Sequence, residues 1–200
     1  MFDFHAHYGT DNGNALVNIL TEDNWKHVSE LRYVAVGLLP WHDENVPGRI
    51  RKVLEENPHA FVGEIGLDRR FGEYDYQRTV IREMLEIARD LSRPVIIHSV
   101  GTTEECLNIL KDMKIEYAIF HSYGSSYELA KKIIDQGYDI SLNRRCFHIR
   151  DYEKIITLPY LLETDLETGA RQKLEIQDIY SRLATAYQVE KKRELWKDNF

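Results

Sequence analysis

The sequence has few cysteines, no long apolar run and no basic leader, and each absence excludes a class of protein. Cys106 and Cys146 are the only cysteines in 200 residues, and they lack the spacing of a metal site. We therefore expect reduced thiols rather than a disulfide framework. No apolar stretch reaches the roughly 20 residues that a membrane-spanning helix needs. A soluble, cytoplasmic protein without membrane contact is expected.

The chain also lacks a concentrated block of positive charge. The formal net charge is −7 at pH 7, and the lysines and arginines form no long block. Proteins that bind nucleic acid through its phosphates normally carry a basic patch, so the composition speaks against a general DNA-binding protein. It leaves open a catalytic site where metal ions and a few arginines supply the positive charge. Nothing in the sequence implies a stable protein partner.

The sequence does have a regular alternation of short apolar runs and longer amphipathic ones, without repeats or linkers. With 43% hydrophobic residues, residues 1–200 suffice for one domain with its own core. Eight runs have the length and composition of buried parallel strands. They are Met1–His7, Ala15–Leu20, Tyr33–Leu39, Ala60–Ile65, Pro94–His98, Tyr117–His121, Tyr138–Leu142 and Tyr160–Thr164.

The clearest helix is predicted at Asp75–Leu91, whose apolar residues share one helical face and which ends shortly before Pro94. Further helices are expected at Thr103–Met113, Ser125–Gln136, Ile176–Tyr187 and Glu190–Lys197. Strands that alternate with helices predict a parallel sheet, and eight strands predict closure into a TIM-type (β/α) barrel. Such barrels usually need about 250 residues, so this one must have short loops or lack an element. An open α/β sheet is the alternative.

Six metal-type side chains lie at the C-terminal ends of five of these runs. They are His5, His7, Glu64, His98, His121 and Asp165. His5 and His7 are two residues apart, so they point to the same face of a strand, although such a pair also arises by chance. Singly, each residue fits an ordinary core or strand-end role. Because active sites of β/α barrels gather at the C-terminal ends of the strands, the whole series predicts a metal site.

Asp3 shares the face of His5 and His7. We consider two roles for it: a group that orients a histidine ligand, or a solvated strand end.

The motifs, taken in order, resemble those of the TatD family of metal-dependent deoxyribonucleases, in the amidohydrolase superfamily. The family's Asp-x-His-x-His is matched by Asp3 to His7, and its Gly-Glu-x-Gly-Leu-Asp by Gly63 to Asp68. Its Pro-x-x-x-His-Ser is matched by Pro94 to Ser99, its His-x-Phe-Ser-Gly loosely by His121 to Ser125, and its Glu-Thr-Asp by Glu163 to Asp165. The correspondence runs through nearly the whole chain.

The resemblance implies a phosphodiesterase with two divalent ions that acts on DNA or another phosphodiester. It assigns one ion to His5, His7, Glu64 and Asp165, and the other to Glu64, His98 and His121, with Glu64 as the bridge. These ligand types suit Mg, Mn or Zn alike. In the usual two-metal chemistry the ions acidify a water and polarise the phosphate oxygens, and Asp165 is a candidate general base.

Two arginine pairs, Arg69-Arg70 and Arg144-Arg145, follow strand ends on the same side of the predicted barrel. A guanidinium fork fits phosphate oxygens, so these residues are candidates for substrate binding. Solvated surface arginines are the equal alternative.

The match departs from the family pattern in two places. Leu39 stands where the family often has a histidine, and Leu166–Arg171 replaces its proline-rich continuation of Glu-Thr-Asp. The substrate therefore stays open. A hydrolase of a small-molecule ester, lactone or amide on the same site is the alternative hypothesis, and a non-catalytic metal-binding interaction protein is the third. Trp41 is a candidate to stack on a base or to pack against a loop.

Overall fold

A computed structural model describes residues 2–9, 13–39, 46–166 and 172–183. Eight parallel strands follow one another in the sheet in their order along the chain. They are β1 (Asp3–His7), β2 (Ala15–Ile19), β3 (Val34–Val36), β4 (Phe61–Asp68), β5 (Val95–Val100), β6 (Ala118–Phe120), β7 (Asp139–Leu142) and β8 (Leu161–Leu162). Each strand overlaps one of the eight predicted runs. Strands β4 and β5 continue past the predicted ends, at Ile65 and His98.

Hydrogen bonds join the segment after β8 to β1. The backbone N–H of Asp165 donates to the carbonyl oxygen of His5, and that of His7 donates to Leu166, both at 2.9 Å. Asp3 adds a side-chain link, because its carboxylate accepts from the backbone N–H of Thr164 at 2.9 Å and from the Thr164 hydroxyl at 2.6 Å. The first and last strands are thereby connected, so the predicted TIM-type barrel is confirmed and the open-sheet alternative is wrong.

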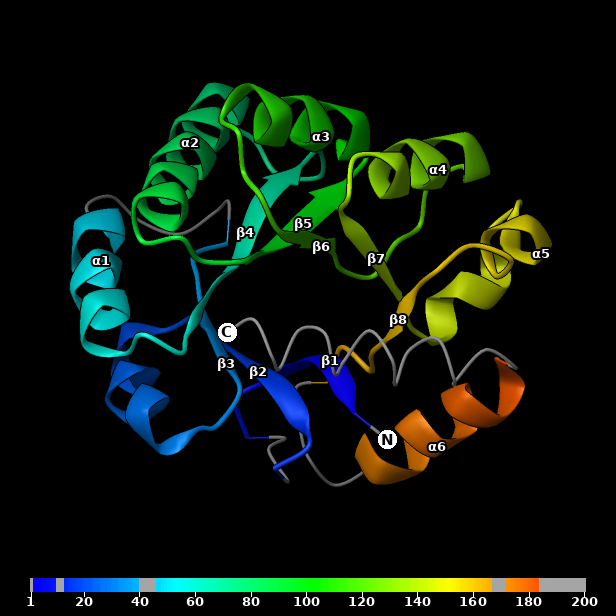
Figure 1. Cartoon of the computed structure of the whole chain (residues 1–200), viewed down its shortest axis with the longest axis horizontal. Helices are drawn as coiled ribbons and strands as arrows, with labels where there is room; N and C mark the ends of the chain where they lie inside the picture. Colours follow the sequence, from blue (N-terminus) through cyan, green and yellow to red (C-terminus); the bar gives the residue numbers. More distant parts are fainter. Residues whose placement is uncertain (1, 10–12, 40–45, 167–171, 184–200) are drawn as a thin grey trace.

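Helices surround the ring of strands (Figure 1). They are η1 (Glu22–Glu30), α1 (Val46–Glu56), α2 (Tyr74–Asp90), α3 (Thr103–Asp112), α4 (Tyr127–Asp135), η2 (Arg144–His148), α5 (Tyr152–Ile155) and α6 (Gln172–Arg182). Helices α2, α3 and α4 match their predictions closely, and α6 begins four residues before the predicted Ile176. The predicted helix Glu190–Lys197 lies outside the described residues. Among these residues, no helix is long and apolar enough to cross a membrane.

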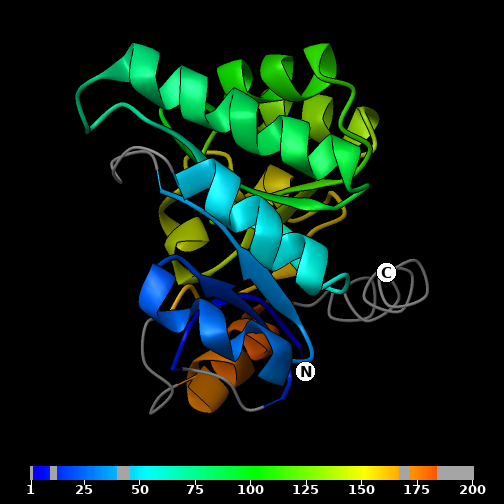
Figure 2. The same ribbon diagram turned by 90° about the vertical axis from the view of Figure 1, so that its left-hand side faces the viewer.

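Helix α1 and the 3₁₀ helix η1 are the main elements that the sequence prediction missed. Helix α1 runs beside α2 on the outside of the barrel (Figure 2), and its own Ile50 and Leu54 are fully buried. The connection from β7 to β8 contains two short helical segments, η2 and the single turn of α5, in place of one long helix. Short connections of this kind allow a complete set of eight strands within 200 residues.

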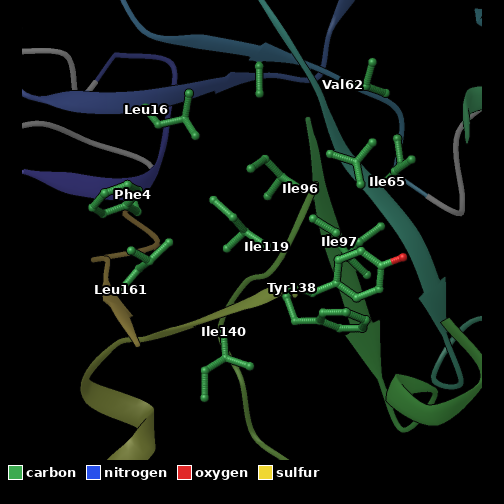
Figure 3. Close-up of a cluster of buried hydrophobic side chains, with 14 of the residues drawn as sticks. Phe4, Leu16, Val62, Ile65, Ile96, Ile97, Ile119, Tyr138, Ile140 and Leu161 are labelled. Carbon is green, nitrogen blue, oxygen red and sulfur yellow. The ribbon is translucent and has the colours of Figure 1, made fainter. Parts of the chain in front are cut away.

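An apolar layer fills the barrel below the predicted site. Ile96 and Ile119 are register partners on β5 and β6, and both are fully buried (Figure 3). Each lies two residues before a predicted ligand, His98 or His121, so it shares the inward face with that histidine. The same alternation that builds the core therefore places the histidines inside the barrel at its C-terminal end.

Candidate metal centre

The six predicted metal-type side chains come together at the C-terminal end of the barrel, with Glu64 at their centre. Oε1 of Glu64 lies 2.6 Å from Nδ1 of His98 and 2.7 Å from Nε2 of His121. Its other oxygen, Oε2, lies 3.4 Å from Nε2 of His5. One carboxylate from β4 thus contacts histidines from β1, β5 and the end of β6.

Asp165 completes the other side of the cluster. Its Oδ1 lies 3.2 Å from Nε2 of His7 and 3.6 Å from Nε2 of His5. The His5 ring stacks on His121, with centroids 4.0 Å apart. Two groups of three residues each have donor atoms that all lie within 4.8 Å of one another, as the ligands of one metal ion must. One group is His5, His7 and Asp165, and the other is His5, Glu64 and His121.

Burial and charge together perturb the pKa values of these groups. Burial alone would raise the pKa of Glu64, but the charge of His121 and hydrogen bonds from the histidines hold it well below its usual range. Burial would lower the pKa of His121, yet the negative charge of Glu64 raises it well above the usual value. The pKa of His5 is lowered by burial and by the neighbouring His121. The cluster therefore keeps its central carboxylate ionised deep inside the protein.

Asp68, at the end of β4, contacts the ring nitrogen of His98 that does not face Glu64. Nε2 of His98 lies 2.9 Å from Oδ2 of Asp68, which leaves Nδ1 facing Glu64. Arg70 donates hydrogen bonds to both oxygens of the same carboxylate, from Nε to Oδ1 at 3.0 Å and from Nη2 to Oδ2 at 2.5 Å. Burial would raise the pKa of Asp68, but these hydrogen bonds lower it to about 2. The sequence prediction had given Asp68 no role.

Glu163 is a second buried carboxylate that the sequence prediction left without a role. Its Oε1 accepts from the backbone N–H of Ser122 at 2.8 Å and from the amide of Asn143 at 3.0 Å, and Oε2 accepts from the Ser141 hydroxyl. The same Oε1 lies 3.7 Å from Nδ1 of His121. Glu163 therefore fixes the segment that carries His121 against β7 and β8.

The amide of Asn18 and the carboxylate of Asp3 support His5. The side-chain nitrogen of Asn18 on β2 lies 3.1 Å from Nδ1 of His5 and donates to the carbonyl of Ala6 at 3.2 Å. Asp3 accepts a hydrogen bond from the backbone N–H of His5 at 3.3 Å. Only 2% of Asp3 is exposed, so the prediction of a solvated strand end is wrong. Its hydrogen bonds fasten the backbone of β1, next to His5, to the segment after β8.

Two glycines allow the backbone around Glu64 to pack closely. A Cβ atom at Gly37 would lie 2.3 Å from the carbonyl carbon of Gly63 and 2.4 Å from the nitrogen of Glu64. A Cβ atom at Gly66 would lie 1.8 Å from the carbonyl oxygen of His98. Larger residues at either position would push β4 away from its neighbours and displace Glu64 from the histidines.

The cluster opens into a cavity of about 430 Å³, whose wall includes Leu39, Arg70 and Arg145 besides five of the six candidate ligands, all but His5. Arg145 donates from Nη1 to Oδ2 of Asp165 at 2.5 Å and to the Ser122 hydroxyl at 3.1 Å. Two predicted substrate-binding arginines therefore reach this cavity, and each is bonded to an acid: Arg70 to Asp68, and Arg145 to Asp165.

The other two predicted arginines lie elsewhere. Arg69 lines a second, neighbouring cavity. Arg144 lines neither of these two cavities, and its Nε lies 3.6 Å from Glu175. Trp41 and residues 167–171 of the loop after Asp165 lie outside the described residues.

Fold and site together define a TIM-type barrel with histidines and carboxylates gathered at the C-terminal ends of its strands. The chain belongs to the TatD family, because a family model described as TatD-related DNase matches residues 3–196.

Several relatives carry related names. An uncharacterized metal-dependent hydrolase of Methanocaldococcus jannaschii is 30% identical over 142 residues, which cover 66% of this chain and 56% of that protein. The uncharacterized metal-dependent hydrolase YjjV of Escherichia coli is 30% identical over 149 residues, which cover 66% and 57%. The human deoxyribonuclease TATDN3 is 26% identical over 115 residues, covering 54% and 42%. The chain thus spans only about half the length of these relatives.

Solved structures support the fold. The crystal structure of YjjV, a TatD homologue from Escherichia coli, superposes with a TM-score of 0.72 at 23% identity, over 82% of this chain and 78% of that one. A TatD-family hydrolase from Entamoeba histolytica gives a TM-score of 0.64 at 16% identity, over 76% and 60%. Both share the barrel with this chain.

Proposed function

We propose that this protein is a metal-dependent hydrolase that cleaves phosphodiester bonds at the end of a DNA strand. The observation that carries the proposal is the convergence of four histidines and two carboxylates at the C-terminal end of the barrel, around the buried carboxylate of Glu64. Membership of a family of TatD-related DNases points the same way.

The residues fit a pair of divalent ions, whether Mg, Mn or Zn. Nε2 of His5 is buried and has no hydrogen-bond partner among the described residues, although it lies between two carboxylates. A buried polar atom without a partner is costly, and a metal ion would satisfy it. One ion would be held by His5, His7, Glu64 and Asp165, and the other by Glu64, His98 and His121. Such ions, when bound, polarise phosphate oxygens and make a water more acidic.

The chain's own side chains would carry the remaining steps. The attacking water forms a new bond to phosphorus, and its proton passes to Oδ1 of Asp165 as the general base. The bond from phosphorus to the ester oxygen breaks, and Asp165 returns the proton it took from the water to that leaving oxygen. Arg145 and Arg70, at the wall of the cavity, would hold phosphate oxygens through their guanidinium groups. Glu64 would keep both ions in place.

The test starts from protein stripped with a chelator and then supplied with Mg or Mn. Wild type is expected to shorten an end-labelled single-stranded oligonucleotide only after metal is restored. Asp165→Asn and His98→Ala are expected to lose most of this activity, while the exposed helix variant Arg89→Ala keeps it. Elemental analysis of the purified protein identifies the bound ions. If wild type cleaves equally well without metal, or if His98→Ala matches wild type, the proposal is wrong.

Leu39 favours one alternative. It lines the cavity of the candidate centre, where it contributes an apolar surface that forms no hydrogen bond with a phosphate. This observation fits a hydrolase of a small-molecule ester, lactone or amide on the same residues. A panel of chromogenic esters and lactones separates the two functions. Metal-dependent turnover of one of these compounds, without cleavage of the oligonucleotide, would favour the alternative.

A further inference from the structure

A second cavity, of about 440 Å³, adjoins the candidate metal centre. Ser99, Val100 and Ser122 line both cavities, so the two are neighbours with a shared wall. None of the six candidate metal ligands lines the second cavity. A molecule held at the metal centre can therefore extend into this space without displacing a ligand.

Arg69 supplies positive charge to the wall of this cavity. Its backbone N–H donates to the carbonyl of Val100 at 3.1 Å, which fixes the start of the residue against the end of β5. Its side chain then passes over Gly101, where a Cβ atom would lie only 3.3 Å from Cδ of Arg69. Glycine at position 101 thus leaves room for the arginine side chain beside the cavity.

Two acids also line the cavity, but each is paired with a cation. Oε1 of Glu105 accepts from Nε of Arg78 at 2.7 Å, and Oε1 of Glu104 accepts from Nζ of Lys132 at 3.1 Å. Neither Arg78 nor Lys132 lines the cavity. Lys132 therefore offsets the charge of Glu104 from outside, whereas Arg78 is shared between Glu105 and Asp75. Arg69 is the one cation among the residues that line the cavity.

Hydroxyl groups complete the wall. Ser99, Thr103 and Ser125 all line the cavity, and Oγ of Ser99 lies 3.2 Å from Oγ1 of Thr103. A guanidinium group together with several hydroxyls is the donor set that proteins use for the phosphates of nucleic acids.

We propose that the second cavity is a phosphate subsite, which binds the phosphate next to the scissile one in a nucleic-acid strand. This inference rests on the proposed phosphodiesterase function. The scissile phosphate occupies the metal centre, and its neighbour along the strand contacts Arg69. The substrate class is therefore a strand with at least two linked phosphates rather than a diester that carries a single one.

The experiment compares two substrates on the full chain loaded with Mg or Mn. Bis(p-nitrophenyl) phosphate has one phosphate and reaches only the metal centre, whereas a short oligothymidylate offers neighbouring phosphates. Arg69→Ala is expected to raise KM for the oligothymidylate by about ten- to hundredfold, the usual effect of losing a charged hydrogen bond. Its KM for the single-phosphate diester should match that of wild type. Arg69→Lys, which keeps the charge, should fall between the two.

Arg89→Ala serves as the matched control, because Arg89 is an exposed arginine on α2 that lines neither cavity. It should leave both KM values unchanged, and the circular dichroism of all variants should match wild type. Equal KM changes for the two substrates would overturn the subsite, since Arg69 would then act on the metal centre. No change for either substrate would overturn it as well.

A binding measurement separates the subsite from the proposed function. Fluorescence anisotropy of a labelled oligothymidylate is measured with metal chelated, so that no cleavage occurs. Weaker binding by Arg69→Ala than by wild type or Arg89→Ala supports the subsite even if no phosphodiester is hydrolysed. Hydrolysis of both substrates by wild type, with the strand bound equally well by Arg69→Ala, leaves the proposed function intact and overturns the subsite.

Discussion

The candidate metal centre has two halves that share Glu64 but are supported by different side chains. In the His98–His121 half, each histidine has a buried carboxylate behind it: Asp68 lies 2.9 Å from His98, and Glu163 lies 3.7 Å from His121. In the His5–His7 half, the amide of Asn18 lies behind His5. An arginine, Arg145, is bonded to the acid of this second half, Asp165.

This difference in supporting side chains leads us to infer different roles for the two halves, one in metal binding and the other in contact with the substrate. A carboxylate behind a histidine fixes the orientation of the ring and raises its basicity, which strengthens metal binding. In the His98–His121 half, Asp68 is such a partner of His98, and Glu163 lies 3.7 Å from His121; both carboxylates are fully buried. In the His5–His7 half, His7 is the most exposed of the six candidate ligands, with 20% of its side chain exposed. We therefore expect the first half to hold its ion more tightly and the second to meet the substrate.

Glu64→Gln is expected to have the largest effect, because it removes the one carboxylate that both halves share. Metal binding should weaken in both halves. Hydrolysis should fall by more than about a hundredfold, because losing a residue that only supports a metal ligand can already cost that much. Elemental analysis and initial rates measure the two effects. Glu86→Gln, at an exposed position on α2, is the control. Retention of two ions per molecule in Glu64→Gln would contradict the shared role.

Asp68→Asn is expected to weaken only the His98–His121 half. Asparagine keeps the shape but not the charge, so the affinity of this half for metal should fall by about ten- to hundredfold. Titration calorimetry with Mn on chelator-treated protein resolves the two binding steps. Asp75→Asn, at the exposed start of α2, should leave both steps as in wild type. If both steps weaken equally in Asp68→Asn, the two halves do not differ as we infer.

The Asp68 carboxylate should also make the metal-free protein sensitive to acid. Its folded-state pKa is about 2, below the ordinary value of 3.8, so it favours folding only while ionised. Its contribution of about 2 kcal/mol is complete above pH 4 and is lost as the pH falls from there towards 2. Urea unfolding at pH 6 and at pH 3 measures the gap between wild type and Asp68→Asn. The gap should be smaller at pH 3, and an equal gap at both values would refute the prediction.

The sequence allowed prediction of the strands and of the clustered side chains, for one physical reason. Buried parallel strands are short and apolar, and polar residues at their C-terminal ends must meet at one end of a barrel. Helix α1 escaped prediction because Pro47 and Gly48 at its start disfavour a helix when they are considered without their neighbours. Proline is nevertheless compatible with a first helical turn.

The supporting side chains could not be predicted, because their partners are distant in sequence. Asp68 meets His98 across 30 residues, and Asn18 meets His5 across 13. Glu163 reaches Ser122 across 41 residues. No local pattern marks such pairs, and they become visible only when β4, β5 and β8 have their places in the barrel.

Asn18→Asp is expected to have the smallest effect, and it would make the two halves alike. The new carboxylate would lie beside Nδ1 of His5 and accept a hydrogen bond from its N–H group, so that Nε2 keeps its lone pair for a metal. The affinity of the His5–His7 half should rise several-fold in the calorimetric titration, while the other half stays unchanged. The rise is limited because burying a further carboxylate near Glu64 and Asp165 opposes it. Asn24→Asp, in η1, is the control, and equal affinities for wild type and Asn18→Asp would show that the amide already supports His5 fully.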